Sequence, residues 1–300
     1  MEILDDEVFS NSPKTARTID DVIEHGYQFN FGDYFNRMFQ LFGKTWGYLL
    51  GHGGILAATY LLIYGVAVVL LISSLKDLGT HPAHPEDAGE VLNAMGPMFR
   101  LMLVAFVFIV VWIIAFVMPF RAGIYSFLKE GLERQQYSFG DFFRPMREKW
   151  LKLVGLVVIW FIAAFFFLGI AYWHWLSELP SMFNTITDPE AMRRNPFVVY
   201  NGMGWVWASY IPTIFFQVSF SLAIPLLIFQ TDSIGKALVG SFRIVTKKWF
   251  YFFALYLVVY VLTVMGIIAC GFGLLLTIQF FPLCIYAIYE DIFIRQNQTL

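Results

Sequence analysis

The chain has 300 residues, of which 58% are hydrophobic and 14% charged, and its mean hydropathy is +0.64. Soluble domains carry about 25% charged residues, so this composition excludes an ordinary soluble domain and predicts an all-α, multi-pass membrane protein. The net charge of −2 gives no reason to expect a nucleic-acid partner.

The first 30 residues are polar and acidic. They carry seven acids against two basic residues, Lys14 and Arg17. Such a composition favours a solvated cytoplasmic tail over 1–30, and docking of this tail to a protein partner is the alternative.

Three amphipathic segments follow along the chain, at 31–46, 139–150 and 234–249. Each combines an apolar stripe at helical spacing with basic residues on the other positions and ends at a tryptophan. A helix of this kind lies in the headgroup plane of a membrane, with its cations near anionic lipid. We call these segments the elbows and expect them to dock lipid or a protein partner through Arg37, Lys44, Trp46, Arg144, Arg147, Trp150, Arg243, Lys247, Lys248 and Trp249.

Each elbow leads into a pair of apolar spans. The last pair is the clearest, because no charged side chain occurs from Phe250 to Tyr289. A single helix of that length would reach about 60 Å, twice the hydrocarbon thickness of a bilayer, so we expect a reversal near Gly271 and Gly273. The six predicted transmembrane helices are 48–73, 101–124, 151–173, 206–229, 250–269 and 272–289.

The order of elbow, tryptophan, span and span occurs three times. The segments Phe31–Phe35 and Phe139–Phe143 read FGDYF and FGDFF, and the second span of each unit carries a proline near its far end. The sequence therefore predicts three helical-hairpin repeats, at 31–134, 135–232 and 233–291, before a tail at 292–300. We expect helix kinks at Pro119, Pro225 and Pro282, which either splay the span ends around a cytoplasmic cavity or ease packing around the elbows.

Lysine and arginine indicate the orientation. Four of the 20 basic residues, Lys76, Arg100, Arg193 and Arg194, lie on the side opposite the elbows. By the positive-inside rule the elbows and both termini are cytoplasmic.

No catalytic constellation is apparent. Arg121 lies near a span end and can snorkel, while Gln217, Gln279, Thr263 and Thr277 are expected to form interhelical hydrogen bonds. His81, His84, Glu86 and Asp87 are metal-ligand types, but the prolines among them favour a flexible acidic loop. Cys270 and Cys284 lie in apolar runs and are interpreted as small hydrophobic residues. We expect no enzyme activity, no cofactor and no metal.

The C-terminal stretch resembles a known group of proteins. Residues 236–293 begin KALVGSFRIVTKKW and end PLCIYAIYEDIF, with Gly271 and Gly273 between. This pattern is similar to poorly characterised bacterial multi-pass families that include the membrane domain attached to some glycerophosphoryl diester phosphodiesterases. The stretch FNFGDYFNRMFQLFGKTWGYLL resembles the start of similar proteins from Bacteroidota-like bacteria. The resemblance implies a bacterial inner-membrane protein and no catalytic residue.

The function expected from these features is non-enzymatic. The leading hypothesis is an integral inner-membrane subunit or scaffold that organises lipid or partner proteins. The alternative is a carrier or flippase for a lipid-like or small neutral substrate.

Overall fold

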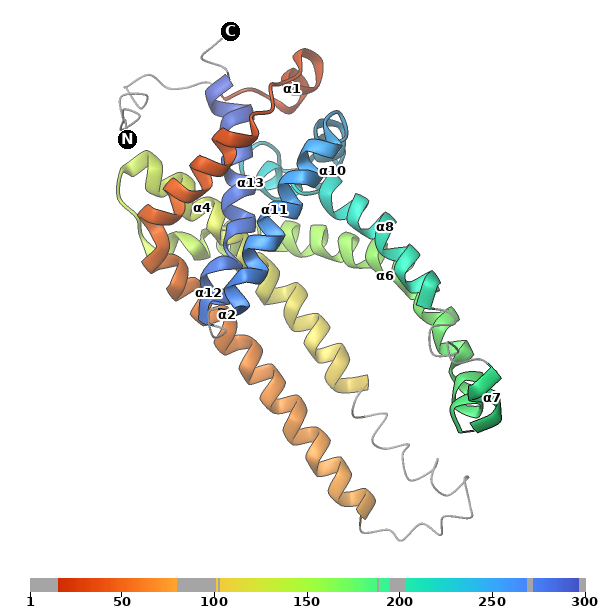
Figure 1. Ribbon diagram of the computed structural model, residues 1–300. Coiled ribbons are helices and arrows are strands. Elements are labelled where there is room, and N and C mark those ends of the chain that lie inside the picture. The colour runs from red at the N-terminus through yellow and green to blue at the C-terminus, as the bar shows by residue number, and fades with distance from the viewer. Residues whose placement is uncertain are drawn as a thin grey trace.

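The computed structural model describes residues 16–79, 101, 103–187, 189–194, 203–268 and 272–296, and over these residues every regular element is helical (Figure 1). Six of the described helices are long and apolar enough to cross a membrane, so the chain is a multi-pass membrane protein. These candidate spans are Phe31–Val69, Leu103–Arg134, Trp150–Gly169, Val206–Phe229, Trp249–Gly266 and Gly273–Arg295.

The chain begins with a short helix, α1 (Ile19–His25), which Thr18 caps by accepting a hydrogen bond from the Asp21 N–H at 3.2 Å. Residues 16–30 of the predicted tail pack against the C-terminal helices, as described below. Residues 1–15 lie outside the described residues.

The first elbow and the first span are one continuous helix, α2 (Phe31–Gly79), of 49 residues. The helix end that the sequence predicts between 46 and 48 is not present, because no proline or turn interrupts this stretch. Figure 1 shows the red first part of α2 running at an angle to its orange remainder. The Thr45 hydroxyl donates to the Leu41 carbonyl at 2.6 Å, a side-chain bond that often bends helices.

The next described segments form the second span, the second elbow and the third span. The second elbow is not one helix but a 3-10 helix followed by a short α-helix, which begins at Arg144 and has Pro145 in its first turn. The elements are helical residues 103–112, the π-helix η2 (Ile113–Val117), α4 (Met118–Arg134), the 3-10 helix η3 (Phe139–Phe143), α5 (Arg144–Glu148) and α6 (Trp150–Thr187).

The remaining elements complete the fold. The third elbow is a helix of its own, and the following span begins at Trp249. The elements are α7 (Pro189–Arg194), α8 (Met203–Ser219), α9 (Ala223–Phe229), α10 (Ile234–Thr246), α11 (Trp249–Ile268), α12 (Phe272–Thr277), α13 (Phe280–Glu290) and the π-helix η5 (Asp291–Arg295).

The second-span segments that follow the three prolines lie together in the buried core. Helix α4 contacts both α9 and α13. The rings of Phe229 and Tyr289 lie 5.1 Å apart, and the Gln230 amide donates to the Tyr289 hydroxyl at 3.0 Å. These ends therefore converge in the described residues, and the splaying considered from sequence is not seen, because large side chains such as Phe127 and Tyr286 fill the space between the helices.

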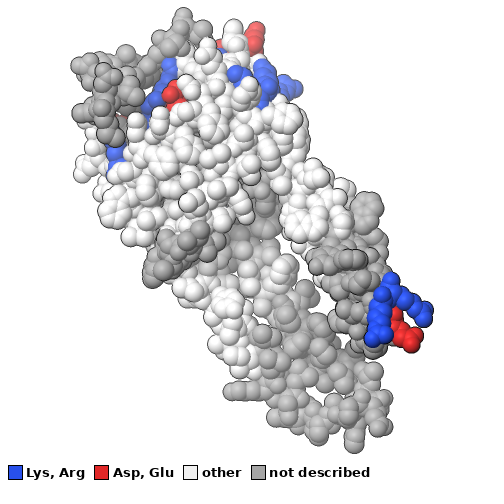
Figure 2. All heavy atoms as spheres, viewed as in Figure 1, with Lys and Arg blue, Asp and Glu red and all other residues white. Residues whose placement is uncertain are grey.

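Exposed apolar side chains and charge separate along the molecule. Many spans expose large apolar groups, such as Leu61 at 70% and Phe165 at 78%, as lipid-facing helices do. On the face in view in Figure 2, charged atoms gather at the end that carries α1 and α10 and reappear around α7, where Arg193, Arg194 and Glu190 lie. The described surface between these two ends is uncharged in this view, as a membrane-embedded band would be.

Candidate functional site

Each of the three prolines follows an irregular stretch of its span. Proline removes the hydrogen bond to the carbonyl four residues earlier, and its ring crowds that carbonyl. Four residues before Pro119 the chain is in the π-helix η2, and four residues before Pro225 and Pro282 it is in turns at 220–222 and 278–279. The irregularities therefore occur where proline disturbs a helix.

Side chains of the elbows bind the backbone at two of these irregular stretches. The Trp150 indole N–H donates to the Ala115 carbonyl at 2.7 Å, inside η2. The Ser241 hydroxyl on α10 donates to the Ser219 carbonyl at 2.9 Å and accepts from the Leu222 N–H at 3.1 Å. Backbone groups freed near Pro119 and Pro225 thus find partners on the next elbow along the chain.

The third irregular stretch is contacted by α2. His52 is fully buried, stacks on the ring of Phe120 and lies 3.2 Å from the Phe120 carbonyl through Nε2. Its Nδ1 lies 3.3 Å from the Gln279 amide nitrogen, so an unprotonated Nδ1 accepts a hydrogen bond there. Next to it, a side chain at Gly53 would overlap the Leu275 carbonyl. The polar groups His52 and Gln279 therefore serve close packing between the first and last spans.

Each elbow packs on a second span from another predicted unit. The first part of α2 packs on α13, η3 and α5 pack on α4, and α10 packs on α9. The contact of η3 with α4 is very close, because a Cβ added to Gly123 would overlap the Phe142 carbonyl. On α10, a Cβ at Gly240 would lie 3.5 Å from Leu226 of α9 and 2.8 Å from Ile19 of α1.

The contact of α2 with α13 contains a buried ion pair. Arg37 donates from Nε to Oε2 of Glu290 at 2.9 Å and from Nη2 to Oε1 at 2.7 Å. The two side chains are 9% and 4% exposed, so Arg37 is not available for lipid docking. Nearby, Arg295 approaches Glu290 at 3.4 Å, and the Tyr34 hydroxyl donates to Asp291 at 2.9 Å.

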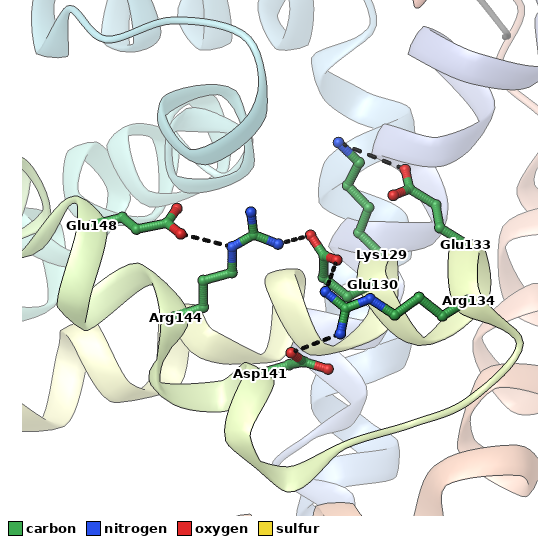
Figure 3. A network of polar contacts seen from close by, with 7 residues as sticks. All are labelled: Lys129, Glu130, Glu133, Arg134, Asp141, Arg144 and Glu148. Atoms are coloured by element: carbon green, nitrogen blue, oxygen red, sulfur yellow. Dashed lines mark hydrogen bonds and ion pairs between the residues drawn. The ribbon is translucent and has the colours of Figure 1, made fainter.

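A second polar network joins α4 to the second elbow (Figure 3). Glu130 accepts hydrogen bonds from Arg134 at 2.6 Å and from Arg144, which also donates to Glu148 at 2.8 Å. The bond to Glu148 and the nearby carboxylates raise the pKa of Arg144 above its usual range. Arg134 also lies 3.5 Å from Asp141, whose second carboxylate oxygen is buried without a partner in the described part of the chain. Arg144 thus binds within the fold.

Basic residues next to the elbow tryptophans also bind within the fold. The Lys149 ammonium donates to the Leu227 and Ile228 carbonyls at the end of α9, at 2.8 and 3.0 Å, where the helix dipole favours a cation. Lys152 and Lys149 both pair with Asp232, at 2.9 and 3.1 Å, and their hydrogen bonds hold the pKa of Asp232 below its usual range.

The N-terminal segment is held by the third elbow and by η5. Lys247 donates to the Ile23 carbonyl, and the Lys248 ammonium lies 5.1 Å from the centre of the Tyr27 ring. The Tyr27 hydroxyl donates to the Ile244 carbonyl at 2.9 Å, and burial raises the pKa of Tyr27. The Arg17 N–H donates to the Phe293 carbonyl at 2.9 Å. These contacts explain why residues 16–30 are ordered.

The remaining predicted docking residues differ in exposure. Trp46 is 54% exposed, whereas Trp249 is partly buried against Phe215 and Phe253, with ring centres 5.4 and 5.1 Å away. Lys44, Arg147 and Arg243 are exposed. The predicted docking set therefore divides into residues that hold the fold together and residues that face outward.

The other polar residues singled out from sequence are also placed. Thr263 and Thr277 exchange hydrogen bonds with each other's carbonyls at 3.2 and 3.0 Å and join α11 to α12. Gln217 is exposed on α8, Arg121 is partly exposed, and Cys284 is buried. The residues of the predicted acidic loop, His81 to Asp87, and Cys270 lie outside the described residues, and the described residues hold no group of three or more potential metal ligands.

Sequence reasoning did not single out Glu290 or Ser241 as functional groups. Glu290 ends an otherwise apolar span, and an acid in that position is a signal for a buried cationic partner. Ser241 stands on the apolar stripe of its elbow, which indicates a polar group that must be satisfied inside the protein.

Comparison with known proteins identifies no relative of this chain. The chain matches no protein-family model, no curated protein and no solved structure.

Proposed function

We propose that this protein is a non-enzymatic scaffold or assembly subunit of the bacterial inner membrane that organises lipid or partner proteins at the cytoplasmic face. In this proposal both termini are cytoplasmic and the elbows lie along that face. The bacterial location rests on the resemblance of the C-terminal stretch to bacterial inner-membrane families, and the orientation rests on the distribution of basic residues.

The proposal includes a ring of three hairpin repeats. Its support is the cyclic pattern of contacts, in which the second elbow packs on the second span of the first unit, the third on that of the second unit, and the first on that of the third. A ring closed in this way leaves each elbow with one face turned inward and one face turned outward.

The observation that carries the function is the division of the elbow side chains between these faces. Arg37 and Arg144 bind acids within the fold, while the Trp46 side chain, at 54% exposure, faces outward. Exposed aromatic side chains beside basic residues at a membrane surface suit binding of lipid or of another protein.

The test measures partners and bilayer order in the same variants. Tagged protein is purified in lipid nanodiscs for quantitative mass spectrometry of co-purifying proteins, and lipid order is measured by fluorescence in reconstituted vesicles. We expect Trp46→Ser to reduce at least one of the two signals, and we expect Leu61→Ala, a change on the exposed apolar surface of α2, to leave both unchanged. Wild-type protein with no stable partner and no effect on bilayer order would contradict the proposal.

The second candidate is a carrier or flippase for a lipid-like or small neutral substrate. It is favoured by Gln217, whose amide is exposed on the apolar helix α8, where a polar group is costly against lipid. A scrambling assay with fluorescent lipid in vesicles tests it. Transport that Gln217→Leu abolishes would support a carrier, and vesicles with no protein-dependent transport would exclude scrambling of that lipid.

A further inference from the structure

The outward face of the third elbow carries basic residues that the fold does not use. Lys236 and Arg243 are exposed on α10, and their side chains have no ion pair or hydrogen bond with the residues that the structure describes. They are two helical turns apart, so both lie on the same side of the helix, about 10 Å from each other along its axis.

The buried face of α10 packs against the core, and the exposed face is accessible to a ligand. Ala237, Ser241 and Ile244 are fully buried, and Ser241 binds the irregular stretch before Pro225. Substitutions at Lys236 and Arg243 therefore change the outward face without removing a contact of the core.

An apolar surface continues from these cations toward the spans. Val239 and Phe242 are 51% and 40% exposed on the same helix. The Phe242 ring packs at 6.4 Å from Phe215 of α8, and Phe215 packs at 5.4 Å from Trp249 at the start of α11. We call Phe215, Phe242 and Trp249 the aromatic shelf.

The other elbows do not offer the same combination. On the first elbow Arg37 is buried against Glu290, so Lys44 is the one exposed cation of residues 31–46. On the second elbow Arg144 is paired with Glu130 and Glu148. Arg147 is exposed on α5, but the aromatic shelf lies on α8, α10 and α11 and not on this elbow. The third elbow therefore differs from the others in carrying two exposed cations, beside an apolar surface, that have no partner in the described part of the chain.

From this arrangement we propose that the face of α10 formed by Lys236, Arg243 and the aromatic shelf binds an anionic glycerophospholipid. The two cations bind the headgroup phosphate, and the acyl chains lie along the shelf toward the hydrocarbon. Charge complementarity selects the anionic lipid, because a zwitterionic headgroup brings its own cation near the phosphate. This inference deepens the proposed function by naming the lipid class and the elbow that binds it.

The experiment compares binding of phosphatidylglycerol and phosphatidylcholine to purified full-length protein by native mass spectrometry during a lipid titration. We expect wild-type protein to prefer phosphatidylglycerol. Each basic residue near a membrane surface contributes about a fivefold change in binding, so Lys236→Gln/Arg243→Gln is expected to weaken phosphatidylglycerol binding about 30-fold and leave phosphatidylcholine binding unchanged.

Two variants control for charge and folding. Arg147→Gln removes an exposed elbow cation away from the shelf and is expected to keep the lipid preference. Lys236→Arg/Arg243→Lys keeps both charges and is also expected to keep it. The proposal is overturned if the double glutamine variant retains the preference or if Arg147→Gln weakens it equally. Displacement of the lipid by sodium phosphate, relative to sodium chloride of equal ionic strength, would also overturn it, because the site would then select free phosphate.

Failure of this test is distinct from failure of the proposed function. The partner and bilayer assays change Trp46 on the first elbow, whereas this experiment changes the third elbow, with its control on the second.

Discussion

The guanidinium of Arg37 binds both carboxylate oxygens of Glu290 and joins two helices whose paired residues are 253 positions apart in the chain. Charged groups buried this deeply are costly to leave unpaired, because each loses its hydration. The pair therefore fixes the first elbow against the last span more by the cost of separating it than by its net attraction.

Removal of one partner is expected to destabilise the protein strongly. In Arg37→Met, the remaining ion pair of Glu290 among the described residues is the contact with Arg295 at 3.4 Å. Breaking a buried pair in this way costs about 3–5 kcal/mol, so we expect a clear fall in the thermal unfolding midpoint, measured by intrinsic fluorescence in detergent.

The matched control removes both charges. Arg37→Met/Glu290→Met leaves no buried unpaired charge, and we expect it to unfold closer to the wild-type midpoint than Arg37→Met does. A double variant at least as unstable as the single one would show that the charges themselves stabilise the contact.

The close approach of η3 to α4 predicts a large effect from one methyl group. Gly123→Ala places Cβ on the Phe142 carbonyl, a backbone atom that cannot move away without shifting η3. Overpacking of this kind costs about 1–3 kcal/mol, which a lower unfolding midpoint would report.

Gly43 on α2 provides the comparison, because a Cβ there has nothing within 4 Å. Gly43→Ala is expected to leave the midpoint unchanged or to raise it, since alanine favours a helix over glycine by about 1 kcal/mol. Equal effects of the two substitutions would contradict the close contact at Gly123.

The hydroxyl of Ser241 predicts a local loss of structure on α8 and α9. Ser241→Ala leaves the Leu222 N–H and the Ser219 carbonyl without this partner in a buried stretch, at a cost of about 1–3 kcal/mol. Hydrogen–deuterium exchange is expected to speed up at residues 219–223 in particular. Ser233→Ala, at the exposed N-cap of α10, is the control, and it should change exchange at α10 rather than before Pro225.

Much of this arrangement follows from local sequence patterns. The six apolar runs give six candidate spans, and the elbow predicted at 234–249 contains the helix α10 with Trp249 beginning the next span. These features depend on residues close together in the chain, such as the Ser233 cap and the apolar stripe, so periodicity and capping suffice to find them.

The contacts that decide the arrangement depend on distant residues. Nothing near Arg37 in the sequence indicates Glu290, and the acidic composition of 1–30 favoured a solvated tail although Tyr27 binds α10. The continuity of α2 was also missed, because the amphipathic pattern of 31–46 and the apolar run of 48–73 were interpreted as two separate helices, whereas one helix contains both.

The contact between the two ends of the described chain predicts that the order of the units can be changed. The backbone N–H of Arg17 donates to the Phe293 carbonyl at 2.9 Å, and the backbone N–H of Gln28 donates to Oε1 of Gln296 at 3.0 Å. If three hairpins form a closed ring, the covalent connection between consecutive units is replaceable at any one point.

We expect a circular permutant that joins the termini by a flexible linker and opens the chain at Gln136 to fold with an unfolding midpoint near that of the wild type. Gln136 is exposed and follows Gln135, whose φ of 55° marks the end of α4.

Opening the chain at Gly53 is the control. This cut lies inside α2, between His52, which binds Gln279, and Gly53, which packs closely on the Leu275 carbonyl. Size-exclusion chromatography and thermal unfolding of both permutants make the comparison. Aggregation of the Gln136 permutant together with a well-folded Gly53 permutant would show that the chain is not a closed ring of three units.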